Sequence, residues 1–218
     1  MKKNIVLFVL FVLPIVAYLF FASGVNSFTT LPTITKNISD VNPQWKSLNG
    51  EVVTLNKKIT ILGFAGENIM SHSSDFFTLN QKIYNKYSPF KDFQFVFIAP
   101  EGTQEEVAQL MRGLGKISDT SRYHFVFASK EDIQTYFNSL KLLGSLNAAG
   151  GTSTVYIIDK KRNLRGRKGK SEQGKPEYKE GYNITSASEL HNEMTDDVKI
   201  ILAEYRLALK RNNADRQI

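Results

Sequence analysis

The chain has 218 residues, 42% of them hydrophobic, with 28 lysines and arginines against 21 acidic residues and no cysteine. This length and apolar fraction suit one folded domain with appendages and exclude an intrinsically disordered chain. The lack of cysteine excludes thiol nucleophiles, disulfides, thiolate-ligated zinc and iron–sulfur clusters, which leaves three histidines and four methionines as candidate metal ligands.

The formal charge of +7 comes from one short segment. Between Lys160 and Lys170 there are seven basic residues and no acid, and the 21 bases elsewhere equal the 21 acids. A single local patch differs from the broad basic surface that follows a phosphate backbone. We therefore exclude nucleic acid as a partner.

The N-terminus has the pattern of a membrane anchor. Lys2 and Lys3 precede an apolar run of 18 residues from Ile5 to Ala22, which at about 1.5 Å per residue nearly spans the hydrocarbon. We predict a transmembrane helix over residues 1–22, with the remainder outside the cytoplasm, the periplasmic side in a Gram-negative bacterium. A cleaved signal peptide is the alternative, because Ala22-Ser23-Gly24 offers a cleavage position, although the run exceeds the usual apolar region of about 7–15 residues.

A polar tether without periodicity is predicted over residues 23–42, a domain over 43–213 and a short tail over 214–218. The domain begins with two short strands, Trp45–Leu48 and Glu51–Leu55. The Asn49-Gly50 dipeptide between them favours a tight hairpin.

Continuous apolar runs and helical spacing predict the next elements. Lys58–Ala65 is a buried strand, and a helix follows whose N-caps lie in Ser71–Ser74. Phe93–Ala99 is a second buried strand, and Thr103–Glu106 has the pattern of a capping box that opens a second helix. The remaining predicted elements are a strand at Tyr123–Ala128, a helix at Lys130–Leu143, a strand at Thr154–Asp159 paired with Asn163–Lys168, a polar loop at Ser171–Tyr182 and a helix at Ser186–Arg211.

The element order predicts an α/β fold with a mixed sheet flanked by helices. An early β-α-β unit implies parallel pairing with a right-handed crossover, whereas the late hairpin implies an antiparallel edge. This mixed sheet between helices is the thioredoxin-like arrangement. It is predicted to carry an N-terminal β-hairpin and one N-terminal transmembrane helix.

Four motifs resemble the Sco family of membrane-anchored, thioredoxin-fold proteins. They are the Asn49–Leu55 hairpin, the strands Ile59–Phe64 and Val155–Asp159, and Leu164-Arg165-Gly166. The resemblance covers roughly residues 45–211 and includes the single anchor. It implies the thioredoxin fold and a role in the assembly of cytochrome c oxidase, to which that family delivers copper.

The chain departs from the family at the copper site. A Sco protein has a Cys-x-x-x-Cys pair where the first core strand meets the first helix, and a histidine before the later core strand. The aligned positions here are Asn68, His72 and Gly151, so none of the three ligands is present. The resemblance therefore implies a degenerate site without copper chemistry, and we expect no cofactor.

Met70 and His72 offer an alternative. A thioether and an imidazole suit Cu(I), so the chain could be a metal-binding accessory protein. Two ligands in a turn make an incomplete site, and the contrasting interpretation is that Met70 packs and His72 lies at the helix start. Glu67 and His72 could form an acid–base pair, but no nucleophile motif or phosphate loop accompanies them. We expect a non-catalytic, partner-binding or respiratory-complex assembly protein rather than an enzyme.

The basic segment is the second candidate site. Arg162, Arg165, Arg167 and Lys168 are predicted to form a docking patch on a surface hairpin, for an acidic partner protein or for anionic lipid headgroups. The alternative is a solvated edge, because lysines on edge strands oppose aggregation.

Overall fold

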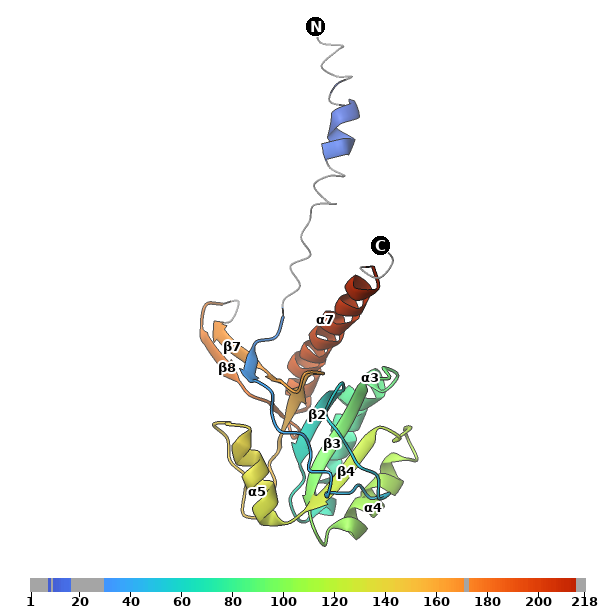
Figure 1. Cartoon of the computed structure of the whole chain (residues 1–218), viewed down its shortest axis with the longest axis vertical. Coiled ribbons are helices and arrows are strands. Elements are labelled where there is room, and N and C mark those ends of the chain that lie inside the picture. The colour runs from blue at the N-terminus through green and yellow to red at the C-terminus, as the bar shows by residue number, and fades with distance from the viewer. Residues whose placement is uncertain (1–7, 9, 17–29, 171–172, 215–218) are drawn as a thin grey trace.

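A computed structural model describes residues 8, 10–16, 30–170 and 173–214 of the chain. Its centre is a sheet of seven strands in the order β1-β6-β5-β2-β3-β4, with β9 also paired to β5. The strands β2 (Ile59–Phe64), β3 (Phe93–Pro100) and β4 (Tyr123–Ala128) are parallel, and β5 (Thr154–Ile158) is antiparallel to β2 (Figure 1). The predicted mixed sheet and its four core strands are confirmed.

The sheet extends further than predicted at its other edge. Strand β1 (Thr33–Thr35) pairs antiparallel with β6 (Leu164–Arg165), and β9 (Tyr182–Asn183) pairs with β5. Two more strands, β7 (Arg167–Lys170) and β8 (Pro176–Lys179), form a separate antiparallel hairpin. The predicted loop at Ser171–Tyr182 is therefore wrong where β8 lies.

Part of the predicted tether is also folded onto the domain. Leu31, Ile38 and Val41 are buried, and β1 adds a strand to the sheet. The expectation of a tether over residues 23–42 is thus wrong from residue 31 onward. The local sequence does not reveal this, because the strand β1 forms by pairing with β6, more than 100 residues further along the chain.

Helices cover both faces of the sheet (Figure 1). A nearly continuous helical segment is built from η1 (Ile69–His72), α2 (Ser73–Leu79), η2 (Asn80–Tyr84) and α3 (Asn85–Tyr87). The other helices are α4 (Gln104–Leu114), α5 (Lys130–Ser139) and the run of α6 (Ala187–Glu189), η3 (Leu190–Met194) and α7 (Thr195–Ala214).

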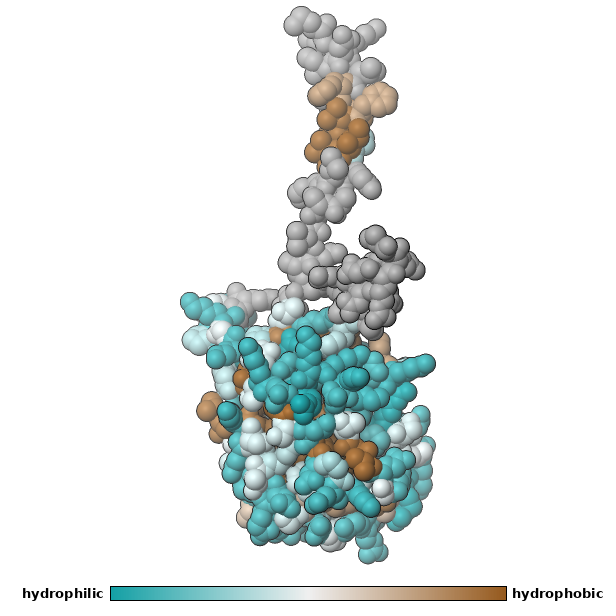
Figure 2. All heavy atoms as spheres, in the orientation of Figure 1, coloured by the Kyte–Doolittle hydropathy of each residue, from teal (hydrophilic) through white to brown (hydrophobic). Residues whose placement is uncertain are grey.

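Alternate residues of each central strand enter two separate cores. Ile59 and Ile61 pack with α2, α4 and α7, whereas Leu62 and Phe64 pack with α5 and with the segment around Trp45. Because both faces are covered, the central strands are mostly apolar, which is why their positions could be predicted. Hydrophilic side chains dominate the face of the domain shown in Figure 2.

The Asn49-Gly50 turn forms, but the strands predicted on either side of it do not. Gly50 has a φ of +78°, as a tight turn requires, and a single bridge joins Lys46 to Val52. Ser47 instead bridges Val126 of β4. The segment therefore covers the free edge of the sheet, a position where an uncovered strand would invite association.

Most of the predicted anchor at residues 1–22 lies outside the described residues. The part that is described, residue 8 and residues 10–16, is helical. Among the helices that the structure does describe, none combines the length and the apolar character needed to cross a membrane.

Candidate functional site at the end of strand β2

A cleft of about 440 Å³ lies where β2 gives way to η1. Asn68 and His72, in the segment that follows β2, line it together with Gly151, which lies in the loop before β5. The structure thus brings together the three positions that the sequence resemblance aligned with the copper ligands of a Sco protein. Side chains of Phe64, Phe76, Phe97 and Ile184 form its apolar part.

Two glycine backbones touch at the base of the cleft. Ala65 and Gly151 form a β-bridge, and a Cβ atom on Gly151 would lie 2.7 Å from the Cα of Gly66. Gly66 itself has a φ of +67°, which favours glycine. Position 151 therefore has no room for a side chain, and a histidine there would require the backbone to move.

The start of the helix at the cleft is capped from another helix. Asn68 has a left-handed backbone with a φ of 58°, and the Met70 amide donates a hydrogen bond of 3.0 Å to a carboxylate oxygen of Glu106 on α4. The predicted caps at Ser71–Ser74 are wrong, because the N-cap residues of η1 and α2 are Asn68 and His72, and neither side chain makes a capping hydrogen bond. The predicted capping box is wrong too, since the Thr103 hydroxyl donates to the carbonyl of Pro100 at 2.7 Å.

Polar side chains form the rim. The His72 side chain is 65% exposed, and its Nδ1 lies 3.8 Å from a carboxylate oxygen of Asp75. Glu67 forms an ion pair of 2.9 Å with Lys130 at the start of α5. The cleft can therefore offer hydrogen bonds and charge around an apolar floor, which is the composition of a binding site.

The structure does not bring Met70 and His72 together as metal ligands. Met70 is partly buried and packs against the core, whereas His72 is exposed on the rim. Within the described residues, no three histidine, aspartate or glutamate side chains gather in the manner of a metal site.

Two of the four residues of the predicted docking patch are paired with carboxylates of the domain itself. Arg165 is buried, with Nη1 3.0 Å from Asp159 and Nη2 3.0 Å from Glu204, and it also donates to the carbonyl of Leu31. Because buried guanidinium groups need paired acceptors, Arg165 is held inside the domain. This network fastens the incoming N-terminal segment to α7.

Arg167, which is half-buried, is the second of these residues. Its guanidinium bonds both carboxylate oxygens of Asp197 at 2.9 and 3.0 Å, and this pairing raises the pKa of Arg167. Asp197 also accepts a hydrogen bond from the Tyr182 hydroxyl, and the pKa of Tyr182 is raised by burial and by that carboxylate. Arg162 bonds Asn37, and Lys168 is exposed.

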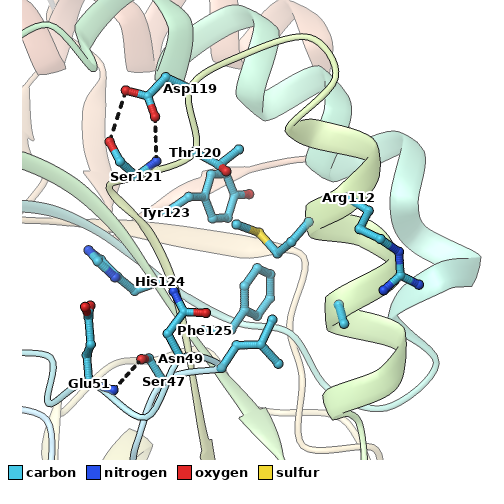
Figure 3. Close-up of a pocket in the computed structure, with 13 residues that line it drawn as sticks. Ser47, Asn49, Glu51, Arg112, Asp119, Thr120, Ser121, Tyr123, His124 and Phe125 are labelled. Atoms are coloured by element: carbon cyan, nitrogen blue, oxygen red, sulfur yellow. Dashed lines mark hydrogen bonds between the residues drawn. The ribbon is translucent and has the colours of Figure 1, made fainter.

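A second cavity, of about 460 Å³, lies beside the edge strand β4 between α4 and the turn at Asn49 (Figure 3). His124 and Glu51 line it, and burial lowers the pKa of His124. Tyr123 also lines it, and the Tyr123 hydroxyl is buried without a hydrogen-bond partner among the described residues. Sequence reasoning missed this cavity, because its residues come from three segments with no shared motif.

No protein-family model matches the sequence, and no curated protein matches it. Among solved structures, a protein from Bacteroides thetaiotaomicron proposed to be a disulfide isomerase superposes with a TM-score of 0.53 and 16% identity, covering 80% of this chain and 95% of that one. BsSco, a member of the Sco family of cytochrome c oxidase assembly proteins, superposes with a TM-score of 0.52 and 11% identity, covering 78% and 95%. At these identities the likeness shows the fold alone, and the fold is thioredoxin-like.

Proposed function

We propose that this chain is a non-catalytic, membrane-anchored protein of thioredoxin-like fold that recognises a partner protein through the cleft at the end of β2. The observation that carries the proposal is the cleft itself. It is lined by Asn68, His72 and Gly151, the positions that the sequence resemblance aligns with the copper ligands of a Sco protein. The cleft therefore offers a binding surface but has no cysteine that could carry out thiol chemistry.

The chemistry of the cleft supports recognition rather than turnover. With no cysteine in the chain, neither disulfide exchange nor thiolate ligation of copper is open to it. The apolar floor and the polar rim supply the two components from which protein interfaces are built, a buried centre and a hydrogen-bonding edge.

The proposed setting follows from the N-terminal sequence and from the likeness to Sco. An apolar run of 18 residues behind two lysines favours a single anchor with the domain outside the cytoplasm. BsSco belongs to a family of cytochrome c oxidase assembly proteins. We extend that setting to this chain, with a respiratory-complex subunit or assembly protein as the partner class.

Site-specific crosslinking in the native membrane tests this function. A photoreactive amino acid at His72, on the rim of the cleft, should capture a defined protein, whereas the same group at the exposed Gln134 of α5 should not. Thr185→Trp, which fills the mouth of the cleft, should abolish the His72 product. The same products from His72 and Gln134, or no loss with Thr185→Trp, would contradict the proposal.

A further inference from the structure

Basic residues from distant parts of the sequence meet at one end of the domain. Here β2 and β3 begin and β5 ends, and their connections are hydrogen-bonded to one another. The Lys57 amide donates to the carbonyl of Lys160 at 3.0 Å, and the Lys58 ammonium donates to the carbonyl of Lys91 at 3.4 Å. Arg206 of α7 lines a small pocket together with Lys91 and Lys160.

We call this end the basic pole and define it by six residues: Lys57, Lys58, Lys91, Lys160, Lys161 and Arg206. Four of them are exposed, and Lys58 and Lys160 are half-buried. The sequence hides this concentration, because only Lys160 and Lys161 belong to the basic segment near residue 165.

The acids near the basic pole are already engaged. Asp92 forms an ion pair with Lys160. Asp159 is 1% exposed, and its carboxylate is paired inward with Arg165, as is that of Glu204. The outward face of the pole therefore keeps a positive potential.

The N-terminal segment joins the domain on the same side. Leu31 is held by Arg165 and by Glu204 of α7, and the ring of Tyr205, one residue further along α7, lies 5.5 Å below the Lys160 ammonium. The β7–β8 hairpin and the far end of α7 also project toward this side (Figure 1). Hydrophilic side chains crowd the end of the domain from which α7 projects (Figure 2).

We propose that the basic pole faces the membrane and contacts anionic lipid headgroups. This inference rests on the anchor included in the proposed function. Residues 23–30 separate the apolar run from Leu31, and eight residues reach at most about 28 Å. The pole is thereby confined near a surface that attracts lysine and arginine side chains.

An aromatic side chain beside the pole supports a lipid surface as the occupant. Phe90 is 45% exposed in the connection before β3, and the pocket that it shares with Leu202 and Tyr205 is mostly apolar. Aromatic side chains flanked by basic residues suit the boundary between headgroups and acyl chains. An acidic protein would use the charges but would leave Phe90 without a clear counterpart.

Single-cysteine labelling tests the inference on the full-length chain, because the chain has no cysteine of its own. An environment-sensitive dye at Asn56→Cys, beside Lys57, is compared with the same dye at Gln134→Cys on α5. The protein is reconstituted in vesicles of phosphatidylcholine, with or without phosphatidylglycerol. We expect a blue shift and quenching by lipid-borne quenchers at position 56 only, and only with phosphatidylglycerol.

Charge variants complete the test. Lys91→Glu with Lys161→Glu should abolish the shift at position 56, whereas the control Lys46→Glu with Lys141→Glu should leave it intact. The shift should also fade at 1 M salt, where the Debye length falls to about 3 Å. A chain that fails to float with either vesicle refutes the anchor. A chain that floats without a shift at position 56 overturns the membrane-facing pole and favours an acidic protein as its ligand.

Discussion

At the scale of single residues, the contact between Gly66 and Gly151 sets the character of the cleft. A methyl group at position 151 would meet backbone atoms of Gly66 and Ala65 at 2.7 to 3.0 Å, and backbone cannot move aside as a flexible side chain can. We expect Gly151→Ala to lower the free energy of unfolding by about 1–3 kcal/mol, the usual cost of overpacking. Denaturant unfolding measures this.

The exposed Gly144 offers a matched control, because a Cβ there would meet its nearest atoms only at 3.9 and 4.0 Å. Gly144→Ala should change the stability by no more than about 0.5 kcal/mol. Equal stability of the two alanine variants would show that the two backbones are not in contact.

Metal binding is a second prediction at this scale. Cu(I) prefers thiolate and thioether ligands, and Met70, the methionine that lies two residues before His72, is packed against the core. We expect titration against a competing chelator to show no stoichiometric Cu(I) binding, with identical curves for the wild type and His72→Ala. Binding of one equivalent that disappears in His72→Ala would restore the metal hypothesis.

The buried Arg165 gives a third prediction. Replacing it by leucine leaves Asp159 buried without its partner, and breaking such a pair costs about 3–5 kcal/mol. Lys168→Leu, at an exposed position of the same basic segment, should cost less than about 0.5 kcal/mol. Thermal and denaturant unfolding of the two variants would separate an internal arginine from a surface one. If Arg165→Leu lowers the free energy of unfolding as little as Lys168→Leu does, Arg165 is not an internal ion-pair partner, and the docking-patch interpretation of Arg165 is favoured.

At the scale of elements, the helix at the cleft depends on a cap from α4. Glu106 accepts the hydrogen bond of the Met70 amide, whereas its neighbour Glu105 is exposed in the first turn of α4. Glu106→Ala should lower the free energy of unfolding by about 1 kcal/mol through the lost cap. Hydrogen exchange at residues 69–75 should also rise in that variant.

Glu105→Ala is the control, since both glutamates lie in the first turn of α4 and interact similarly with its dipole. If the two alanine variants exchange equally at residues 69–75, the cap does not stabilise the helix at the cleft.

The same elements show what could be predicted from sequence. The strands Ile59–Phe64 and Thr154–Ile158 were predictable because burial on both faces leaves a nearly continuous apolar run, and they are indeed hydrogen-bonded neighbours. Strand β1 and the β7–β8 hairpin were missed, because short polar strands depend on a distant partner rather than on local pattern.

The candidate site was predictable only in part. Alignment with the Sco family placed Asn68, His72 and Gly151, which line one cleft. The contact of Gly151 with Gly66 and the cap from Glu106 are tertiary contacts, separated by dozens of residues in sequence, and no local spacing reveals them. For the same reason, a run of basic residues could not reveal that the Arg165 side chain is buried and paired with Asp159.

At the scale of the whole molecule, retention or cleavage of the apolar run decides whether the domain stays attached to the membrane. A retained anchor keeps residues 5–22 in the protein, and the run is longer than the apolar region of most signal peptides. We expect N-terminal sequencing and intact mass of the detergent-extracted protein to show a chain that still contains this run. A mature protein that begins at Gly24 or later would demonstrate cleavage.

Strand polarity has a geometric consequence for partner choice. Strands β2 and β3 are parallel, begin at the basic pole and run toward the end where the cleft opens. The eight residues of β3, at about 3.3 Å each, separate these two ends by about 26 Å. With the pole resting on the headgroups, the domain acts as a spacer that holds the cleft at this height above the bilayer. A partner embedded in the same membrane must then extend a segment to that height, and one confined to the headgroup layer is out of reach.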